Sequence, residues 1–376
     1  MKLMFLNSID EQTYGGMEEW IRLVAGGLSQ RGHQITICGR EKSEFLNRVK
    51  RSEICAAIIE LKISGDFNPV TITRIKKEIS RREINTLIVN FNKDIRLGGL
   101  AAKLSGEVSV VWSVGLDITK DSFAHKLITP RLIDGVIVPS HSLKTQITRH
   151  GYVAPEMVEV IHIGIPEIEN NLTKSTAVEK MRKRFKLDKN SIICVTCGRL
   201  VEQKGHRYLV EAASKVVRVH PNVVFLFLGD GPLKSSIQEN IARPGLQNHF
   251  ILAGMVENVA EVLEGCDLMI HPAVEEPFGI AVLEGMRAGL PIIASNVGGL
   301  PEVVGNNGCA VLVAPKEADS LEKAINSILE TPDTMLKMGE AAKLRWQECF
   351  RYELMIDKIE KYLEKLSAKV REYGNA

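Results

Sequence analysis

The chain has 376 residues, of which 45% are hydrophobic and 25% are charged, and its formal net charge is +2. This length exceeds one ordinary hydrophobic core and predicts two domains, and the weak charge argues against a dedicated nucleic-acid binder. The first ten residues, MKLMFLNSID, lack the apolar core of a signal peptide, and no apolar run reaches the 18 residues that a membrane-spanning helix needs. We therefore expect a cytoplasmic protein.

Short apolar runs alternate with amphipathic stretches along the chain, which predicts an α/β fold of parallel sheets covered by helices. The first half is expected to contribute six strands, KLMFLN, QITICG, AAIIEL, TLIVNF, VSVVWSV and GVIVPS. The second half is expected to contribute six more, IICVTCG, VVFLFLG, HFILAG, LMIHPAV, PIIASN and CAVLVAP. The polar stretch PEIENNLTKST (166–176) lacks periodicity and is the expected linker.

The loops that follow the strands are the places to seek a site, because ligands of open parallel sheets bind beyond the carboxyl ends of the strands. After the first strand, Gly15 and Gly16 precede a helix and would let backbone amides approach a ligand, although tight packing explains a glycine pair at least as well. The chain contains neither the G-x-G-x-x-G dinucleotide pattern at this place nor a P-loop. A Rossmann dehydrogenase and a P-loop enzyme are therefore not indicated.

Polar residues also follow the fourth expected strand. Asn92, Lys93 and Asp94 lie in NFNKDIRLGG (90–99), which we expect to be a loop that either meets an acceptor or is simply solvated. Just before it, RIKKEISRRE (74–83) concentrates five cations. Such a helix either lies on an anionic membrane or is a solvated surface helix.

Two cations flank the loop after the first strand of the second half. Arg199 and Lys204 stand in CGRLVEQKGH, and a pyrophosphate would be held by such a pair, with arginine as a planar fork and lysine as a point charge. Either residue alone is more often a solvated surface side chain. Together with the expected helix start at 278–280 and the glycines of NVGGLPE (296–302), they outline an anion site.

The segment EEPFGIAVLE (275–284) carries a carboxylate at each end of an apolar run. Pro277 and Gly279 predict a turn, so Glu276 is expected in a loop and Glu284 inside the following helix. That helix is apolar nearly all round, and a lone carboxylate close to a core needs a polar partner. Glu284 therefore pairs with a neighbouring arginine, caps a loop, or serves a ligand.

The seven cysteines are scattered, and most lie in apolar runs. Cys194 and Cys197 form a C-x-x-C inside an expected strand, and no second Cys or His pair follows at zinc spacing. Reduced, buried thiols are expected, rather than a redox or metal site.

These motifs together resemble the retaining glycosyltransferases of family 4. The resemblance rests on Glu276 and Glu284 with seven residues between them, on the N-terminal glycine pair before a helix, and on three further segments: GRLVEQKG (198–205), LGDGPL (228–233) and VGGLPE (297–302). In order and spacing it covers nearly the whole chain.

The resemblance implies the GT-B fold, in which two Rossmann-like parallel-sheet domains face a cleft. Residues 1–165 would form an acceptor-binding domain, and residues 166–348 would form a nucleotide-sugar-binding domain. Residues 349–376 would form a C-terminal helix that packs back on the N-terminal domain. The end of the chain independently predicts a long amphipathic helix, because apolar residues recur there at helical spacing: Met355, Ile359, Tyr362, Leu363, Leu366 and Val370.

By the resemblance, Glu284 would take the ribose hydroxyls of the nucleotide and Glu276 the hydroxyls of the transferred sugar. Arg199 and Lys204 would clamp the diphosphate, and with Glu276 they would be the catalytic residues. The other donor-binding residues would be Gly15, Gly16, Phe278, Gly279 and Ile280. No D-x-D occurs in the sequence, so the leaving diphosphate would be stabilised by fixed cations and a helix end, with no metal and no cofactor.

The acceptor side departs from the family pattern. Many members carry a histidine in the N-terminal domain near the donor sugar, whereas here VVWSVGLDITKD offers Ser113 near that place and no histidine before His125. The candidate acceptor-binding residues are therefore Asn92, Lys93, Asp94 and Ser113.

The expected function is retaining, metal-independent transfer of a sugar from a nucleotide-diphosphate donor, with a UDP-sugar as first choice. The acceptor would be a glycan or a lipid-linked molecule, as in the synthesis of lipopolysaccharide or another surface polysaccharide, with peripheral contact at the inner face of the cytoplasmic membrane. Two alternatives stay open. One is another GT-B enzyme, such as a nucleotide-sugar epimerase or a phosphorylase, and the other is a non-catalytic nucleotide-sugar-binding subunit.

Overall fold

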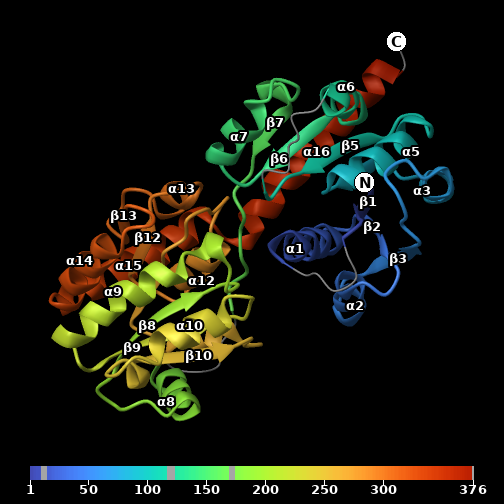
Figure 1. Ribbon diagram of the computed structural model, residues 1–376. Helices are drawn as coiled ribbons and strands as arrows, with labels where there is room; N and C mark the ends of the chain where they lie inside the picture. Colours follow the sequence, from blue (N-terminus) through green and yellow to red (C-terminus); the bar gives the residue numbers. More distant parts are fainter. Residues whose placement is uncertain (10–14, 117–122, 169–173, 375–376) are drawn as a thin grey trace. The chain divides into compact units, whose positions relative to one another are not determined.

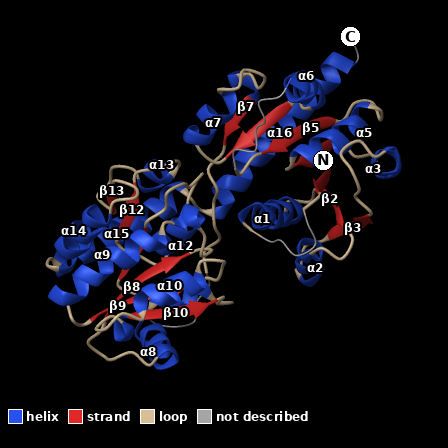
Figure 2. Ribbon diagram, in the orientation of Figure 1, coloured by secondary structure: helices blue, strands red, loops and turns tan. Residues whose placement is uncertain are grey.

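The structure is a computed structural model of the chain, and it describes residues 1–9, 15–116, 123–168 and 174–374 (Figure 1). The chain divides into two compact units. The first contains Met1–Gly164 together with the residues from Glu353 onward, and the second contains Ile165–Tyr352. Each unit is a parallel β-sheet with helices packed against it (Figure 2). The expected α/β class with two Rossmann-like domains is confirmed.

The sheet of the first unit has seven parallel strands in the order β3-β2-β1-β4-β5-β6-β7. Their bounds are β1 (Lys2–Asn7), β2 (Gln34–Arg40), β3 (Ala56–Leu61), β4 (Thr86–Val89), β5 (Ser109–Ser113), β6 (Gly135–Val138) and β7 (Val158–Val160). The six expected strands are all present, and β7 is an addition to them. It has three residues with Glu159 exposed in the middle, so it lacks the apolar run by which the other strands are recognised.

The helices of the first unit include one that comes from the far end of the chain. Their bounds are α1 (Gly16–Gln30), α2 (Glu44–Arg51), α3 (Pro69–Arg82), α4 (Asn92–Asp94), η1 (Ile95–Gly99), α5 (Leu100–Lys103), α6 (Phe123–Leu132), α7 (His141–Thr148), η2 (Pro155–Met157) and α16 (Tyr352–Gly374). In α16, Ile359 and Leu363 are fully buried, and Ser367 Oγ lies 2.8 Å from Thr86 Oγ1. The apolar face of this last helix thus belongs to the core of the first unit.

Within the segment NFNKDIRLGG (90–99), residues 92–99 are helical, which corrects the expectation of a loop. It forms the short helix α4 and the π-helix η1, which continues into α5. Phe91 N donates a hydrogen bond of 2.9 Å to Asp94 Oδ2 and so satisfies an amide at the helix start. A Cβ added at Gly98 would lie 2.8 Å from Leu6 and 2.9 Å from Leu87. The glycine there lets η1 approach the sheet, and it does not mark a turn.

The sheet of the second unit has six parallel strands in the order β10-β9-β8-β11-β12-β13, all of them expected. The strands are β8 (Ile192–Cys197), β9 (Val223–Leu228), β10 (Phe250–Gly254), β11 (Leu268–His271), β12 (Ile292–Ser295) and β13 (Ala310–Val313). The helices are α8 (Lys174–Phe185), η3 (Glu202–Lys204), α9 (His206–Val219), α10 (Lys234–Ile241), η4 (Gln247–His249), α11 (Val259–Glu264), α12 (Ile280–Arg287), α13 (Leu300–Val304), α14 (Ala318–Leu329) and α15 (Pro332–Cys349).

The expected linker 166–176 is shorter in the structure, because α8 begins at Lys174 and takes up its last three residues. Residues 169–173 lie outside the described part of the chain.

Each sheet has one point where the strand order reverses, between β1 and β4 in the first unit and between β8 and β11 in the second. Crevices at such switch points are where open α/β sheets bind their ligands. In the second unit, the loops that follow β8 and β11 carry Lys204 and Glu276. The topology therefore directs attention to these two loops.

Candidate active site

The loops after β8 and β11 are in direct backbone contact with each other. Val274 N donates a hydrogen bond of 2.8 Å to the carbonyl oxygen of Gln203. Gly205 has φ +65°, and a Cβ added there would lie 2.0 Å from the carbonyl oxygen of Pro272. Only glycine fits both the left-handed backbone and the close approach, so the two loops hold a fixed relative position.

A buried carboxylate lies between these loops. Lys204 Nζ donates to Glu276 Oε2 over 2.6 Å, and His271 Nε2 lies 2.7 Å from the same oxygen. The side chain of Glu276 is 10% exposed and that of His271 is 2% exposed. An ionised carboxylate can only accept hydrogen bonds, so Nε2 of His271 carries the hydrogen. Glu276 and Lys204, which the sequence analysis assigns to the sugar and the diphosphate of a donor, are thus in direct contact.

The environment keeps Glu276 ionised. Burial raises the pKa of this carboxyl, but the hydrogen bonds and charges of His271 and Lys204 outweigh burial and lower the pKa to about 2. Glu276 is therefore a carboxylate at neutral pH. It can accept hydrogen bonds from ligand hydroxyls or stabilise positive charge, and it holds no proton to donate as a general acid.

The backbone of Glu276 is fixed by the segment VGGLPE. Gly299 N donates to the carbonyl oxygen of Glu276 over 3.0 Å. At Gly298, which has φ +54°, an added Cβ would lie 1.9 Å from that same oxygen. These glycines support the loop that carries Glu276. The amide of Gly299 is already bonded, so it does not contribute to an anion site in this structure.

The remaining donor candidates of this unit lie at the same edge of the sheet. Arg199 is exposed two residues beyond the end of β8, and among the described residues its guanidinium forms no hydrogen bond or ion pair. Gly279, with φ +118°, precedes Ile280, the first residue of α12. The ring of Phe278 is buried and lies 6.1 Å from the ring of Phe350, so only the backbone of Phe278 could face a ligand.

Glu284 lies half-buried on α12, as the sequence predicts. Burial lowers the pKa of Arg287, whereas the charges of Glu284 and Glu264 raise it, so the arginine and the two carboxylates are electrostatic neighbours. The interpretation of Glu284 as the partner of a nearby arginine thus has a physical basis. Its role toward a ligand remains a prediction.

The glycine pair of the first unit has a partner within the chain. Gly15 N donates to Glu18 Oε2 over 2.9 Å, and the other oxygen of Glu18 accepts from Asn7 Nδ2 over 3.1 Å. Glu18 is 2% exposed. A carboxylate of the protein itself therefore caps the start of α1 and takes the amide of Gly15, while Gly16 is exposed.

The candidate acceptor residues share one edge of the first sheet. Asn92, Lys93 and Asp94 follow β4, and Ser113 ends the neighbouring strand β5. Asp94 is fully buried, and this burial raises its pKa to about 6, although hydrogen bonds from Ser8 and from nearby backbone amides lower it.

Two buried histidines of the second unit are missing from the candidates drawn from the sequence. Besides His271, His206 at the start of α9 places Nε2 3.1 Å from the carbonyl oxygen of Arg199. Burial lowers its pKa to about 4, so it is neutral at pH 7 and Nε2 donates to that carbonyl. Their position in the sequence could have identified them, because both histidines lie beside loops at the carboxyl edge of the sheet.

The cysteines of the C-x-x-C pattern are structural. Cys194 and Cys197 lie on β8 with buried, free thiols, and burial raises the pKa of both. A reactive or metal-binding cysteine has a lowered pKa, so the two thiols have the opposite character.

No helix in the described part of the chain has the length and apolar character needed to cross a membrane.

Family models match two separate parts of the chain. The model described as Glycosyltransferase Family 4 matches residues 14–167, and the model described as Glycosyl transferases group 1 matches residues 177–345. Together the two matches extend over most of both units.

Individual relatives agree with this. The N-acetyl-alpha-D-glucosaminyl L-malate synthase of Bacillus anthracis is 26% identical over 346 residues, which is 89% of each chain. The 2-deoxystreptamine glucosyltransferase of Streptomyces kanamyceticus is 26% identical over 227 residues, which is 58% of each chain. The chain spans about half the length of the first curated relatives that it matches. The crystal structure of Anabaena Alr3699/HepE in complex with UDP has a TM-score of 0.83 at 20% identity and covers 97% of this chain and 100% of its own, which shows the shared fold.

Proposed function

Because the chain belongs to the glycosyltransferases of the GT-B fold, we propose that it transfers a sugar from a UDP-sugar to a glycan or lipid-linked acceptor. The observation that carries the proposal is the contact of Lys204 and His271 with the ionised carboxylate of Glu276 at the switch point of the second sheet. The solved relative HepE binds UDP, which favours this nucleotide.

The second unit would hold the donor. Glu276 offers carboxylate oxygens to the hydroxyls of the sugar. The ammonium group of Lys204 has three hydrogens, of which Glu276 takes one, so two remain for phosphate oxygens. The exposed guanidinium of Arg199 can bind the diphosphate in a bidentate manner. Glu284 would hold the ribose, and the backbone of Phe278, Gly279 and Ile280 would line the site.

The chemistry follows from the leaving group. Cleavage of the bond between the anomeric carbon and the diphosphate places negative charge on the β-phosphate. Lys204, Arg199 and the N-terminus of α12 stabilise that charge, and the ionised Glu276 stabilises the positive character that develops on the sugar. Because these groups already neutralise the leaving diphosphate, the reaction proceeds without a metal ion. The anomeric configuration is retained, as in family 4.

The first unit would hold the acceptor at the edge formed by Asn92, Lys93, Asp94 and Ser113. The half-buried Asn92 and Lys93 supply hydrogen-bond donors and an acceptor for hydroxyl groups, as a sugar acceptor requires, whereas Asp94 and Ser113 belong to the buried part of that edge. We place the reaction in the synthesis of lipopolysaccharide or a related surface glycan.

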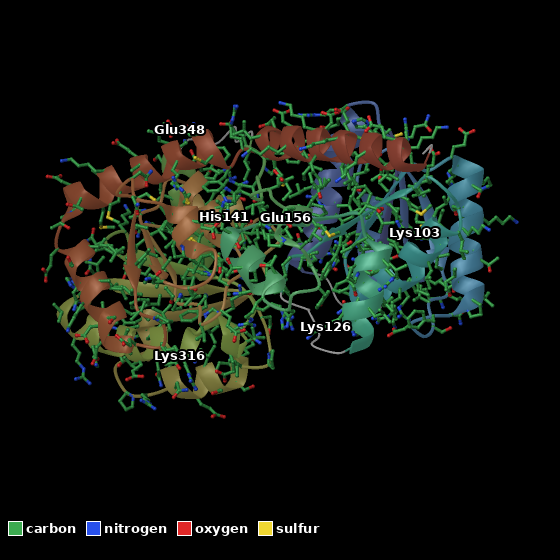
Figure 3. All side chains as sticks on the ribbon, turned by 90° about the horizontal axis from the view of Figure 1, so that it is seen from above. Lys103, Lys126, His141, Glu156, Lys316 and Glu348 are labelled. Carbon is green, nitrogen blue, oxygen red and sulfur yellow. The ribbon has the colours of Figure 1, made fainter. Side chains whose placement is uncertain are left out.

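A lipid-linked acceptor fits the surface of α3. In the basic stretch 74–83, Arg81 and Arg82 pair with Glu78, whereas Arg74, Lys76 and Lys77 are exposed. Two apolar side chains nearby are also exposed, Phe67 at 49% and Val70 at 74%. Lys103 and Lys126 are also exposed in the first unit (Figure 3), where Lys103 pairs with Asp134. The surface of α3 suits peripheral contact with anionic lipid at the inner face of the cytoplasmic membrane.

The proposal is tested by UDP binding and by hydrolysis of UDP-sugars without acceptor. Lys204→Ala and Arg199→Ala should each reduce kcat/KM by an amount equivalent to about 2–4 kcal/mol. Lys215→Ala is the matched control, because Lys215 pairs with Asp319 on the surface of the same unit. Glu276→Gln should mainly lower turnover, and Glu284→Ala should mainly weaken UDP binding.

Near-normal rates in either cation variant would contradict the diphosphate clamp. Binding of UDP-sugars without any hydrolysis or transfer would favour a non-catalytic binding subunit, and an altered sugar still attached to UDP would reveal an epimerase.

The metal-free mechanism has its own test. Hydrolysis should continue with excess EDTA after extensive metal removal. Near-complete loss of activity, restored by magnesium or manganese, would overturn this part of the proposal.

A further inference from the structure

The two oxygens of the Glu276 carboxylate are not equivalent. Oε2 receives both Lys204 Nζ and His271 Nε2, whereas no donor among the described residues reaches Oε1. Two donors on one oxygen fix the rotation of the carboxylate about its last bond. Oε1 is thereby left free to accept a hydrogen bond from a ligand.

The two donors differ in how firmly they are held. His271 is the last residue of β11, a strand paired on both sides with β8 and β12, and its side chain is 2% exposed. Lys204 is the last residue of the short 3-10 helix η3, and its flexible side chain is 25% exposed. A bound diphosphate would compete with Glu276 for the ammonium group of Lys204. The imidazole of His271 would stay in place and remain the fixed donor.

Packing alone does not explain a histidine at this position. His271 Nδ1 is buried and has no hydrogen-bond partner. Leaving a polar atom unsatisfied in this way costs free energy, and an aliphatic residue would fill the end of β11 without that cost. The hydrogen bond from Nε2 to Glu276 is therefore what the histidine provides.

We propose that His271 is a positioning residue that holds the carboxylate of Glu276 with Oε1 directed at a hydroxyl of the transferred sugar. The role rests on the proposed function of Glu276 and adds an orienting partner to it. The loop backbone is fixed by Gly298 and Gly299, and the side chain is fixed by His271. Such second contacts decide how precisely a reacting group is held.

The test compares two variants of His271. His271→Leu removes the donor, and His271→Gln places an amide N–H close to the position of Nε2. With whichever of UDP-glucose, UDP-galactose and UDP-N-acetylglucosamine the wild type hydrolyses, His271→Leu should lower kcat about 10- to 100-fold. The dissociation constant for UDP, which carries no sugar, should change less than about threefold. His271→Gln should recover most of the lost kcat.

The matched control is His249→Gln. His249 Nδ1 lies 2.8 Å from the carbonyl oxygen of Val223, so this variant also replaces a partly buried, hydrogen-bonded histidine of the same unit. It should leave kcat unchanged. Wild-type kcat in His271→Leu, equal losses in the leucine and glutamine variants, or a parallel loss of UDP affinity would each overturn the positioning role.

The variant Glu276→Gln distinguishes failure of the proposed function from failure of the role of His271. If Glu276→Gln retains wild-type kcat, or if the wild type hydrolyses none of the donors, the proposed function fails. If Glu276→Gln is impaired and His271→Leu is not, only the role of His271 fails. When both are impaired, the double variant should be little worse than the worse single variant, because the two residues act as a pair.

A measurement without donor tests the hydrogen bond itself. In protein labelled with nitrogen-15 histidine, His271 should show a hydrogen on Nε2 that exchanges slowly with water. Glu276→Gln should shift this signal, and His249→Gln should not. Absence of a hydrogen on Nε2, or no response to Glu276→Gln, would overturn the inference regardless of the reaction.

Discussion

Replacement of Asp94 by asparagine should make the first unit more stable at neutral pH. Asp94 is fully buried, and burial raises its pKa from 3.8 to about 6, although hydrogen bonds from Ser8 and nearby backbone amides lower it. Because the folded-state pKa lies above the unfolded value, the protonated acid favours folding. This contribution is complete below about pH 4 and is lost as the pH rises through 6.

The size of the effect follows from the two pKa values. A difference of about 2 pKa units corresponds to about 3 kcal/mol in the free energy of unfolding. Asparagine has nearly the shape of the protonated acid and no charge. The free energy of unfolding of Asp94→Asn should therefore exceed that of the wild type by up to about 3 kcal/mol at pH 8, and the difference should become small near pH 4.

Tryptophan fluorescence can follow the first unit separately. Of the three tryptophans, Trp20 and Trp112 lie in the first unit and Trp346 in the second, so the measurement uses a Trp346→Phe background. Urea unfolding is recorded at pH 4, 6 and 8, with Asp66→Asn as an exposed control. If the difference between Asp94→Asn and its parent does not change with pH, the raised pKa is refuted.

Three further predictions concern the second unit and the last helix. Gly298→Ala should destabilise the second unit by about 1–3 kcal/mol more than Gly308→Ala. Both glycines have positive φ, but only the Cβ added at position 298 would meet a carbonyl oxygen, at 1.9 Å. Equal melting temperatures of the two variants would contradict this prediction. Glu276→Gln should lower the free energy of unfolding by about 3 kcal/mol at pH 7. Because the pKa of Glu276 in the folded protein, about 2, lies below its ordinary value of 4.5, this loss should shrink as the pH falls from 4.5 toward 2. Urea unfolding monitored by Trp346 at pH 7 and pH 3 measures the loss, and a loss that is the same at both pH values would argue against the lowered pKa. Deletion of residues 353–376 should unfold the first unit and leave the second folded, as judged by circular dichroism and proteolysis, and a protease-resistant first unit in the truncated chain would show that the helix is dispensable.

The strands could be predicted because each is a short apolar run bounded by polar or turn residues. The exception, β7, has an exposed glutamate at its centre and is identified only by its pairing with β6. The segment 90–99 is expected to be a loop because polar residues follow the apolar run of β4. In the structure, Gly98 instead gives η1 room against Leu6 and Leu87, and such a requirement depends on tertiary packing that no local pattern displays.

The candidate site, too, could be predicted from the sequence only in part. Lys204 and Glu276 could be chosen from the sequence, since a cation and a carboxylate after parallel strands suit a nucleotide sugar. Their direct contact, and the part of His271 in it, could not. It depends on β8 lying next to β11, which brings together residues 72 positions apart in the chain. The lowered pKa of Glu276 is likewise a property of the assembled cluster.

The position of α16 has a consequence for the order in which the protein folds during synthesis. The second unit is one continuous stretch of chain, so all of it is available once Tyr352 has been made. The first unit begins at the N-terminus, yet part of its core, including Met355, Ile359 and Leu363, is translated after the whole of the second unit. Until then the surface that α16 covers is exposed to solvent. The half that is synthesised first is therefore the half that is completed last, and in a cell it is the nascent first unit that would most need protection by a chaperone.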